Sequence, residues 1–124
     1  MKPLLHEDEF VFCTMPEEKF RDLPAEPLFV FRESEGLTLV LPIDEAESLK
    51  LQGAFPSRMI TLSVYSSLDT VGFLAAVTAK LAEHGISVNA VSAYFHDHLF
   101  VPVDRAREAM EILRDFSSSE PHHK

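Results

Sequence analysis

The feature that most constrains this chain is an internal repeat of one folding pattern. The segment LVLPIDEAESL, residues 39–49, aligns without a gap with LFVPVDRAREA, residues 99–109, and leucine, proline, aspartate and alanine recur at matching positions. In each copy an apolar run ends at a proline, and an aspartate then opens a helical pattern as a capping residue does. The agreement of apolar pattern, proline and cap indicates that the chain duplicates one unit.

The second copy has the pattern β-α-β-β-α. Its first strand alternates apolar and polar residues, its first helix repeats apolar residues at three- and four-residue spacing, and Gly85 is a typical helix stop. Its second helix is expected to begin at Asp104, an N-cap residue. The expected elements are a strand at 59–65, a helix at 71–82, a hairpin of residues 86–95 and 99–103 that turns at His96, Asp97 and His98, and a helix from 104.

The first copy is shorter. A strand at 9–15 and a hairpin at 27–42, turning at 34–36, correspond to strands of the second copy. Only residues 16–27 separate them, and prolines 16, 24 and 27 interrupt that segment, so a full first helix does not fit. This copy is therefore expected to be abbreviated.

The two patterns together predict an α+β fold of two ferredoxin-like modules packed together, with helices on one face of the strands. We expect a first module over residues 5–55, a second over 57–116 and a disordered tail over 117–124. The linker at 49–58 is short, so the two halves are expected to dock closely.

Composition excludes several classes of function. The 124 residues carry 20 acidic against 11 basic side chains, a net charge of −9, and such a chain repels polyanions. Nucleic acid and anionic membranes are therefore not expected as partners. No apolar run approaches the roughly 18 residues that span a bilayer, and MKPLLHEDEF does not have the pattern of an export signal. The single Cys13 makes no internal disulfide, as is typical of a cytoplasmic protein.

The second half resembles a known regulatory family. The run SLDTVGFLAAVTAKLAEHGISVNAVSAY, residues 67–94, is similar to the signature of ACT domains, small ferredoxin-like modules that bind amino acids. Over residues 5–116 the chain resembles small, mostly bacterial two-module ACT proteins without known enzymatic activity, and these are similar to the tandem ACT modules of cytosolic arginine sensors. Common ACT domains have a proline before the loop glycine, whereas this chain has Val71, so the resemblance does not fix the loop conformation. The positions that fill the signature are Asp69, Gly72, Leu74, Leu81, Gly85 and Ile86.

Gly72 lies where the amphipathic helix of the second copy begins. Glycine inside a helix lowers the stability of the helix by about 1 kcal/mol relative to alanine. A glycine here is therefore expected to have a role that requires the absence of a side chain. A helix N-terminus offers unpaired amide protons and partial positive charge to a carboxylate. Two explanations stay open: Gly72 lets a ligand or a neighbouring backbone approach these amides, or it lets the helix pack tightly on its own sheet.

The resemblance implies an effector site at this strand-to-helix loop, near an interface between modules. Asp69 either caps the helix or binds an α-ammonium group, the two serine hydroxyls either line the pocket or serve the loop alone, and Asn89 faces either a ligand cleft or solvent. The residues expected at the ligand are Ser66, Ser67, Leu68, Asp69, Val71, Gly72 and Asn89.

Other polar residues have weaker support. Glu33 and Glu35 in the first hairpin, with Asp97 in the second, are candidates to reach a cationic ligand across an interface, although such acidic turns are usually solvated. His96 and His98 invite a metal hypothesis, but in a tight turn they are expected at the surface, so no metal and no cofactor is predicted. Cys13, on a strand without a basic neighbour, is expected to be buried and inert.

These observations predict a non-catalytic protein. No arrangement of nucleophile and base, phosphate loop or metal-ligand spacing stands out from the sequence. The first hypothesis is a cytoplasmic regulatory module that binds an amino acid and forms a homo-oligomer. The alternative is a structural or interaction module that oligomerises without a small molecule.

Overall fold

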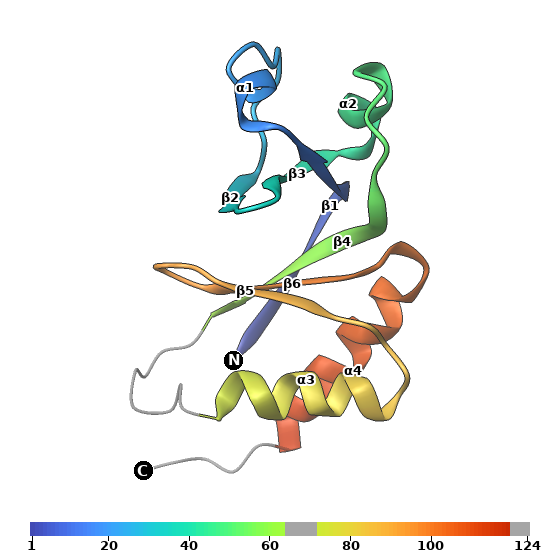
Figure 1. Cartoon of the computed structure of the whole chain (residues 1–124). Coiled ribbons are helices and arrows are strands. Elements are labelled where there is room, and N and C mark those ends of the chain that lie inside the picture. Colours follow the sequence, from blue (N-terminus) through green and yellow to red (C-terminus); the bar gives the residue numbers. More distant parts are fainter. Residues whose placement is uncertain (64–71, 120–124) are drawn as a thin grey trace. The chain divides into compact units, whose positions relative to one another are not determined.

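The computed structural model describes residues 1–63 and 72–119 and divides them between two compact units (Figure 1). Unit 1 contains Met1–Glu7 and the chain from Arg58 onward, and unit 2 contains Asp8–Ser57. Strands β1 (Lys2–Met15) and β4 (Ala54–Ser63) each contribute residues to both units. Both strands begin before the expected strands at 9–15 and 59–65.

Unit 2 is the abbreviated copy. Helix α1 (Glu17–Phe20) has only four residues, and the hairpin of β2 (Phe29–Glu33) and β3 (Gly36–Pro42) turns at residues 34–35, as predicted. Strand β3 lies between β2 and β1, antiparallel to both. Alternate residues of β1 and β3 form one apolar core with helix α2 (Ile43–Ser48), namely Val11, Cys13, Met15, Leu37, Leu39, Leu41 and Ala46.

Unit 1 contains the full set of elements. Helices α3 (Phe73–Glu83) and α4 (Ala106–Ser119) pack on one face of strands β4, β6 (Asp97–Pro102) and β5 (Asn89–Ser92) (Figure 1). The core on that face contains Ile60, Leu62, Val77, Leu81, Leu99, Val101 and Leu113, all of them fully buried. Alternate residues of β4 and β6 face this core, while Thr61 and Phe100, which lie between them on the other face, are also buried.

The repeat seen in the sequence is confirmed in three dimensions. Pro42 ends β3 and Pro102 ends β6, and their backbone angles agree closely, with φ −55° and ψ 142° against φ −53° and ψ 141°. Each proline is also the N-cap residue of the helical segment that follows, α2 in unit 2 and the 3-10 turn Val103–Arg105 before α4 in unit 1. Asp104 lies inside this turn, so its predicted role as the N-cap is wrong.

The second hairpin turns earlier than the sequence suggested. Strand β6 already begins at Asp97, Ser92 pairs with Asp97, and the Ala93 amide donates to the His96 carbonyl over 2.9 Å. The turn therefore consists of residues 93–96, and the prediction that His96, Asp97 and His98 form it is wrong. His98 is a half-buried strand residue opposite Val91.

A hydrogen-bonded chain crosses three strands on the face of unit 1 that the helices leave uncovered. The Thr61 hydroxyl lies 2.8 Å from His6 Nε2 and 2.9 Å from His98 Nδ1. A hydroxyl has one hydrogen, so Thr61 donates a hydrogen bond to one of the two histidine rings and accepts one from the other. Burial lowers the pKa of His98, the charges of His96 and His6 lower it further, and Asp97 partly opposes them.

The N-terminal residues of β1 belong to unit 1 through further contacts. Arg58 Nε donates to the His6 carbonyl over 2.9 Å, and the Ser117 hydroxyl donates to the Met1 carbonyl over 2.8 Å. Helix α4 extends to Ser119, so the first three residues of the expected tail are helical, and residues 120–124 lie outside the described residues. None of the helices in the described part of the chain is long and apolar enough to cross a membrane.

We predict that Gly53→Ala destabilises unit 2. An alanine Cβ at this position would lie 2.5 Å from the Val11 Cβ and 2.6 Å from its Cγ2, and Val11 is a buried core residue. Overpacking of this kind costs about 1–3 kcal/mol of the free energy of unfolding. Urea denaturation of the variant measures it, with the exposed neighbour Gln52→Ala as control. Equal stability of the two variants would contradict the prediction.

We also predict that His98 makes unit 1 less stable in acid. Because the folded protein holds the pKa of His98 below its ordinary value, the unfolded chain binds more protons as the pH falls below about 6.5. The free energy of unfolding should then be higher at neutral pH and decrease through this window.

Urea denaturation at several pH values tests this for the wild-type chain and for His98→Gln. The variant should show a weaker pH dependence, whereas His84→Gln, which replaces an exposed histidine of the same unit, should retain the wild-type slope. An unchanged slope in His98→Gln would contradict the assignment.

Candidate functional site

Helix α3 begins at a glycine with a left-handed backbone. Gly72, the N-cap residue, has φ +81° and ψ −12°, a conformation that costs other residues about 1–2 kcal/mol. A Cβ added to Gly72 would meet no described atom within 4 Å. Among residues 1–63 and 72–119, the backbone angle therefore favours glycine here, and no close contact of the helix with its own sheet requires it.

The two ends of α3 differ in whether a side chain contacts their backbone groups. At the C-terminal end, Arg105 donates from Nη2 to the His84 carbonyl over 2.9 Å and from Nη1 to the Gly85 carbonyl over 3.4 Å, so a cation lies where the helix dipole favours one. At the other end, the first intrahelical bond runs from the Ala76 amide to the Gly72 carbonyl over 2.9 Å. The preceding amides have no partner inside the helix, and Gly72 has no side chain to accept them.

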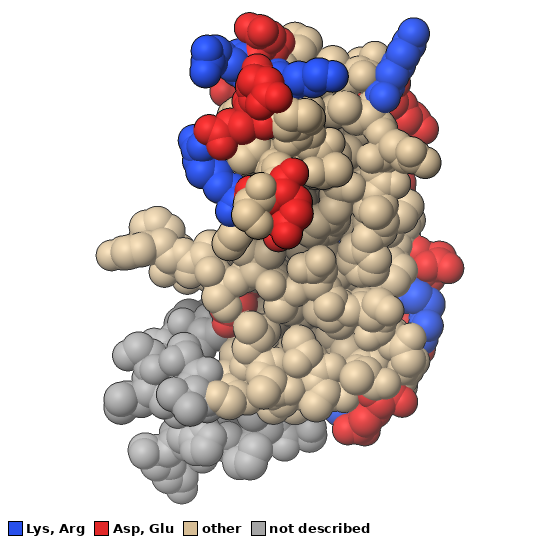
Figure 2. All heavy atoms as spheres, in the orientation of Figure 1, with Lys and Arg blue, Asp and Glu red and all other residues tan. Residues whose placement is uncertain are grey.

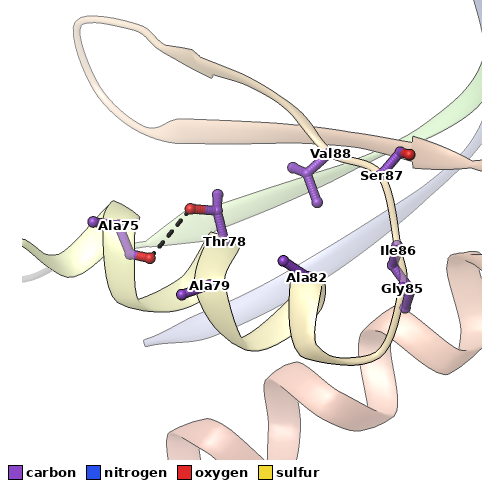
Figure 3. A pocket seen from close by; sticks show the side chains of 8 residues that line it. All are labelled: Ala75, Thr78, Ala79, Ala82, Gly85, Ile86, Ser87 and Val88. Carbon is purple, nitrogen blue, oxygen red and sulfur yellow. Dashed lines mark hydrogen bonds between the residues drawn. The ribbon is translucent and has the colours of Figure 1, made fainter.

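An open groove of about 730 Å³ follows the outer side of α3 and the connection to β5 (Figure 3). Its walls are mostly small or apolar, and none of its residues is charged. The only hydroxyl on the helix wall, that of Thr78, is turned back to the carbonyls of Leu74 and Ala75 at 3.0 and 3.2 Å. The groove is lined by Ala75, Thr78, Ala79, Ala82, Gly85, Ile86, Ser87 and Val88.

Two aromatic side chains are exposed at the end of the β5–β6 hairpin. Tyr94 is 93% exposed and Phe95 is 81% exposed, and their rings pack edge to face with centroids 4.8 Å apart. In Figure 1 this end of the hairpin projects away from the helices of unit 1, and uncharged residues lie at that place in Figure 2. Neighbouring exposed aromatic residues of this size mark interaction sites more often than isolated ones do.

The structure separates some of the residues that the sequence grouped at the ligand. Ser66, Ser67, Leu68, Asp69 and Val71 lie outside the described residues, and Gly72 is at the start of α3. Asn89 is exposed and pairs with Phe100, whose neighbours Leu99 and Val101 face the helices. Since cross-strand partners share a face, the Asn89 side chain lies on the face away from the helices and does not meet the start of α3.

Two of the three acidic candidates accept hydrogen bonds within their own hairpins. Glu33 accepts a hydrogen bond from the Thr38 hydroxyl in unit 2, and Asp97 accepts one from the Ser92 hydroxyl over 2.7 Å in unit 1. Glu35 lies exposed in the β2–β3 turn. In the absence of a ligand, all three carboxylates thus lie at hairpin ends, and two of them hydrogen-bond there.

The remaining reactive side chains in the described part of the chain do not form a metal or thiol centre. His96 and His98 have ring centroids 6.2 Å apart. Within residues 1–63 and 72–119, no cluster of three or more histidine, cysteine or acidic side chains is positioned to hold a metal ion. Cys13 is only 4% exposed, as predicted, and burial raises the pKa of its thiol.

The groove on α3 was not anticipated from the sequence. Its signal was present, because alanines 75, 76, 79 and 82 occupy solvent-facing positions where a surface helix normally has charged residues. The same residues also fit the apolar spacing of a buried stripe. Only the packing shows which alanines line a surface.

Comparison with known proteins identifies the modules. An ACT-domain family model matches residues 1–58 and a second ACT-domain model matches residues 54–115. Among curated proteins, none matches this chain.

Solved structures of similar fold include a Vibrio cholerae protein of unknown function, named a possible transport protein. It is 42% identical, with 94% of this chain and 89% of that chain covered and a TM-score of 0.84. An Agrobacterium tumefaciens protein is 18% identical, with 98% and 96% covered and a TM-score of 0.76. The ligand-free regulatory subunit of aspartate kinase from Thermus thermophilus is 10% identical, with 93% and 97% covered and a TM-score of 0.65.

At these low identities the last two structures show the fold alone. The two family models, however, together match most of the chain, and both describe regulatory ACT domains and no catalytic family. The repeat, the α+β modules and these matches agree: this chain belongs to the ACT-domain family and carries two ACT domains in tandem.

Proposed function

We propose that this protein is a non-catalytic cytoplasmic regulator that binds an amino acid at the start of α3. The observation that carries the proposal is the left-handed N-cap Gly72, which leaves the first amides of the helix without a side-chain acceptor from the cap residue. No atom of the described residues lies within 4 Å of the position that a Cβ of Gly72 would take. These amides and the helix dipole favour an α-carboxylate. Membership in the ACT-domain family supports the same class of ligand.

The residues proposed to complete the site come from the resemblance. Asp69 would bind the α-ammonium group, and the hydroxyls of Ser66 and Ser67 would hydrogen-bond to the ligand. Glu33 and Glu35 are the candidates to recognise a cationic side chain across an interface between modules. A ligand that binds one packing of the modules more tightly than another shifts the population toward the packing that it prefers. The free energy of this shift equals the difference between its binding free energies for the two packings.

A screen of the standard amino acids by thermal unfolding and calorimetry tests the proposal. A ligand at 100 times its dissociation constant should stabilise the chain by about 2.7 kcal/mol. Asp69→Ala should weaken binding, whereas Asp44→Ala, which removes an exposed carboxylate of unit 2, should leave it unchanged. Absence of any shift or heat with every amino acid would contradict the proposal.

The second candidate function is an interaction module without a small-molecule ligand. A specific observation favours it, namely the exposed pair Tyr94 and Phe95 on a projecting hairpin. The two functions are compatible, because this hairpin and the start of α3 are separate parts of unit 1.

A further inference from the structure

A second cavity lies between helices α3 and α4 of unit 1. The two helices pack against each other and share one apolar core (Figure 1). The cavity has a volume of about 310 Å³, which is at the lower end of the range of small-molecule sites. Its lining residues are Lys80, His84, Ile112, Asp115 and Phe116. They are separate from the residues of the groove and from the start of α3.

The spacing along each helix brings these side chains together. Lys80 and His84 are one turn apart at the end of α3, and the three residues of α4 follow the i, i+3, i+4 pattern of a single helix face. Ile112 is a buried core residue, and Phe116 packs against the same core. The cavity therefore has an apolar floor that two packed helices hold in place, and helices position a site more precisely than loops do.

The cavity combines a cation from one helix with an anion from the other, namely Lys80 and Asp115. The Lys80 ammonium lies 3.7 Å from the Glu83 carboxylate, and both side chains are partly exposed. Such a surface ion pair contributes little free energy, so Lys80 can turn to a bound anionic group at little cost. In a chain with a net charge of −9, this lysine supplies the attraction that such a group needs.

The ring of His84 forms a fixed part of the wall. Its Nδ1 lies 3.1 Å from the Lys80 carbonyl, and because a carbonyl only accepts, Nδ1 donates this hydrogen bond. In the neutral ring, Nε2 is then an acceptor. Arg105 donates to the His84 carbonyl over 2.9 Å and so holds the backbone of the same residue. The cavity thus offers two acceptors for an ammonium group, Nε2 of His84 and the Asp115 carboxylate.

We propose that this cavity is a second small-molecule site, which binds a small zwitterion with an apolar side chain, such as leucine. Lys80 binds its carboxylate, Asp115 and His84 bind its ammonium group, and Ile112 and Phe116 contact its side chain. A ligand with a single charge would meet one group of like sign in the cavity, whereas a zwitterion pairs with both. This site is additional to the one proposed at the start of α3 and does not require it.

NMR of the full chain with ¹³C-labelled isoleucine δ1 methyl groups tests the location. The four isoleucines report on different places: Ile112 on the cavity, Ile86 on the groove, Ile60 on β4 and Ile43 on unit 2. Titration with L-leucine should shift the Ile112 signal most. Two analogues, 4-methylpentanoate without the ammonium group and 3-methylbutan-1-amine without the carboxylate, should each bind about tenfold more weakly, because each loses a charged hydrogen-bonding group.

Substitutions separate this site from the one proposed at the start of α3. Lys80→Met keeps most of the side-chain length without the charge and should weaken leucine binding about tenfold, whereas Lys2→Met, at an exposed lysine of unit 1 outside the cavity, should not. Asp69→Ala should leave the Ile112 titration unchanged, so the two proposals can fail independently. Circular dichroism checks that each variant is folded. An unshifted Ile112 signal, analogues that bind as tightly as leucine, or wild-type affinity in Lys80→Met would each overturn the proposal.

Discussion

The structure depends on the burial of one face of each unit's strands. In unit 1, alternate residues of β4 and β6 pack against α3 and α4, and in unit 2 alternate residues of β1 and β3 pack with α2 and its flanking apolar residues. Each fully buried leucine or isoleucine contributes about 2 kcal/mol, far more than a surface ion pair such as Arg32–Glu17. This burial fixes which residues remain on the other face, on the outer side of α3 and at the edge of β5.

Much of the fold could be predicted because the pattern that drives this burial is local in sequence. The alternation along the strands and the helical spacing before Gly85 each lie within about a dozen residues, and each copy of the repeat carries its own proline, at 42 and at 102. The sequence did not predict the hairpin turn at 93–96, because this segment contains two aromatic residues and neither the glycine nor the asparagine of common turns. The polar residues that follow, two histidines and an aspartate, looked more like a turn. The position of His98 depends on Thr61, which is 37 residues away in the sequence.

The two informative glycines show where local reasoning stops. The low helix propensity of glycine indicated that Gly72 has a particular role. The left-handed φ angle that explains this glycine is a property of the folded protein and cannot be read from the sequence. Gly53 looked like an ordinary linker residue, and its contact with Val11 appears only when β1 and the segment before β4 come together. The candidate site follows the same division: the sequence indicated the start of α3, and only the packing revealed the groove along its outer side.

Helix α3 carries both the proposed ligand site and the groove. The cap residue Gly72 gives the amides of its first turn no side-chain acceptor, and its outer side forms one wall of the groove. If an amino acid at the first turn changes how α3 packs on its sheet, it also changes the shape of this groove. Linkage then requires the effect to be reciprocal: a molecule that binds the groove and favours one packing of α3 changes the affinity for the amino acid by the same factor by which the amino acid changes its own. A rigid helix shared by both surfaces is the element through which such coupling would act.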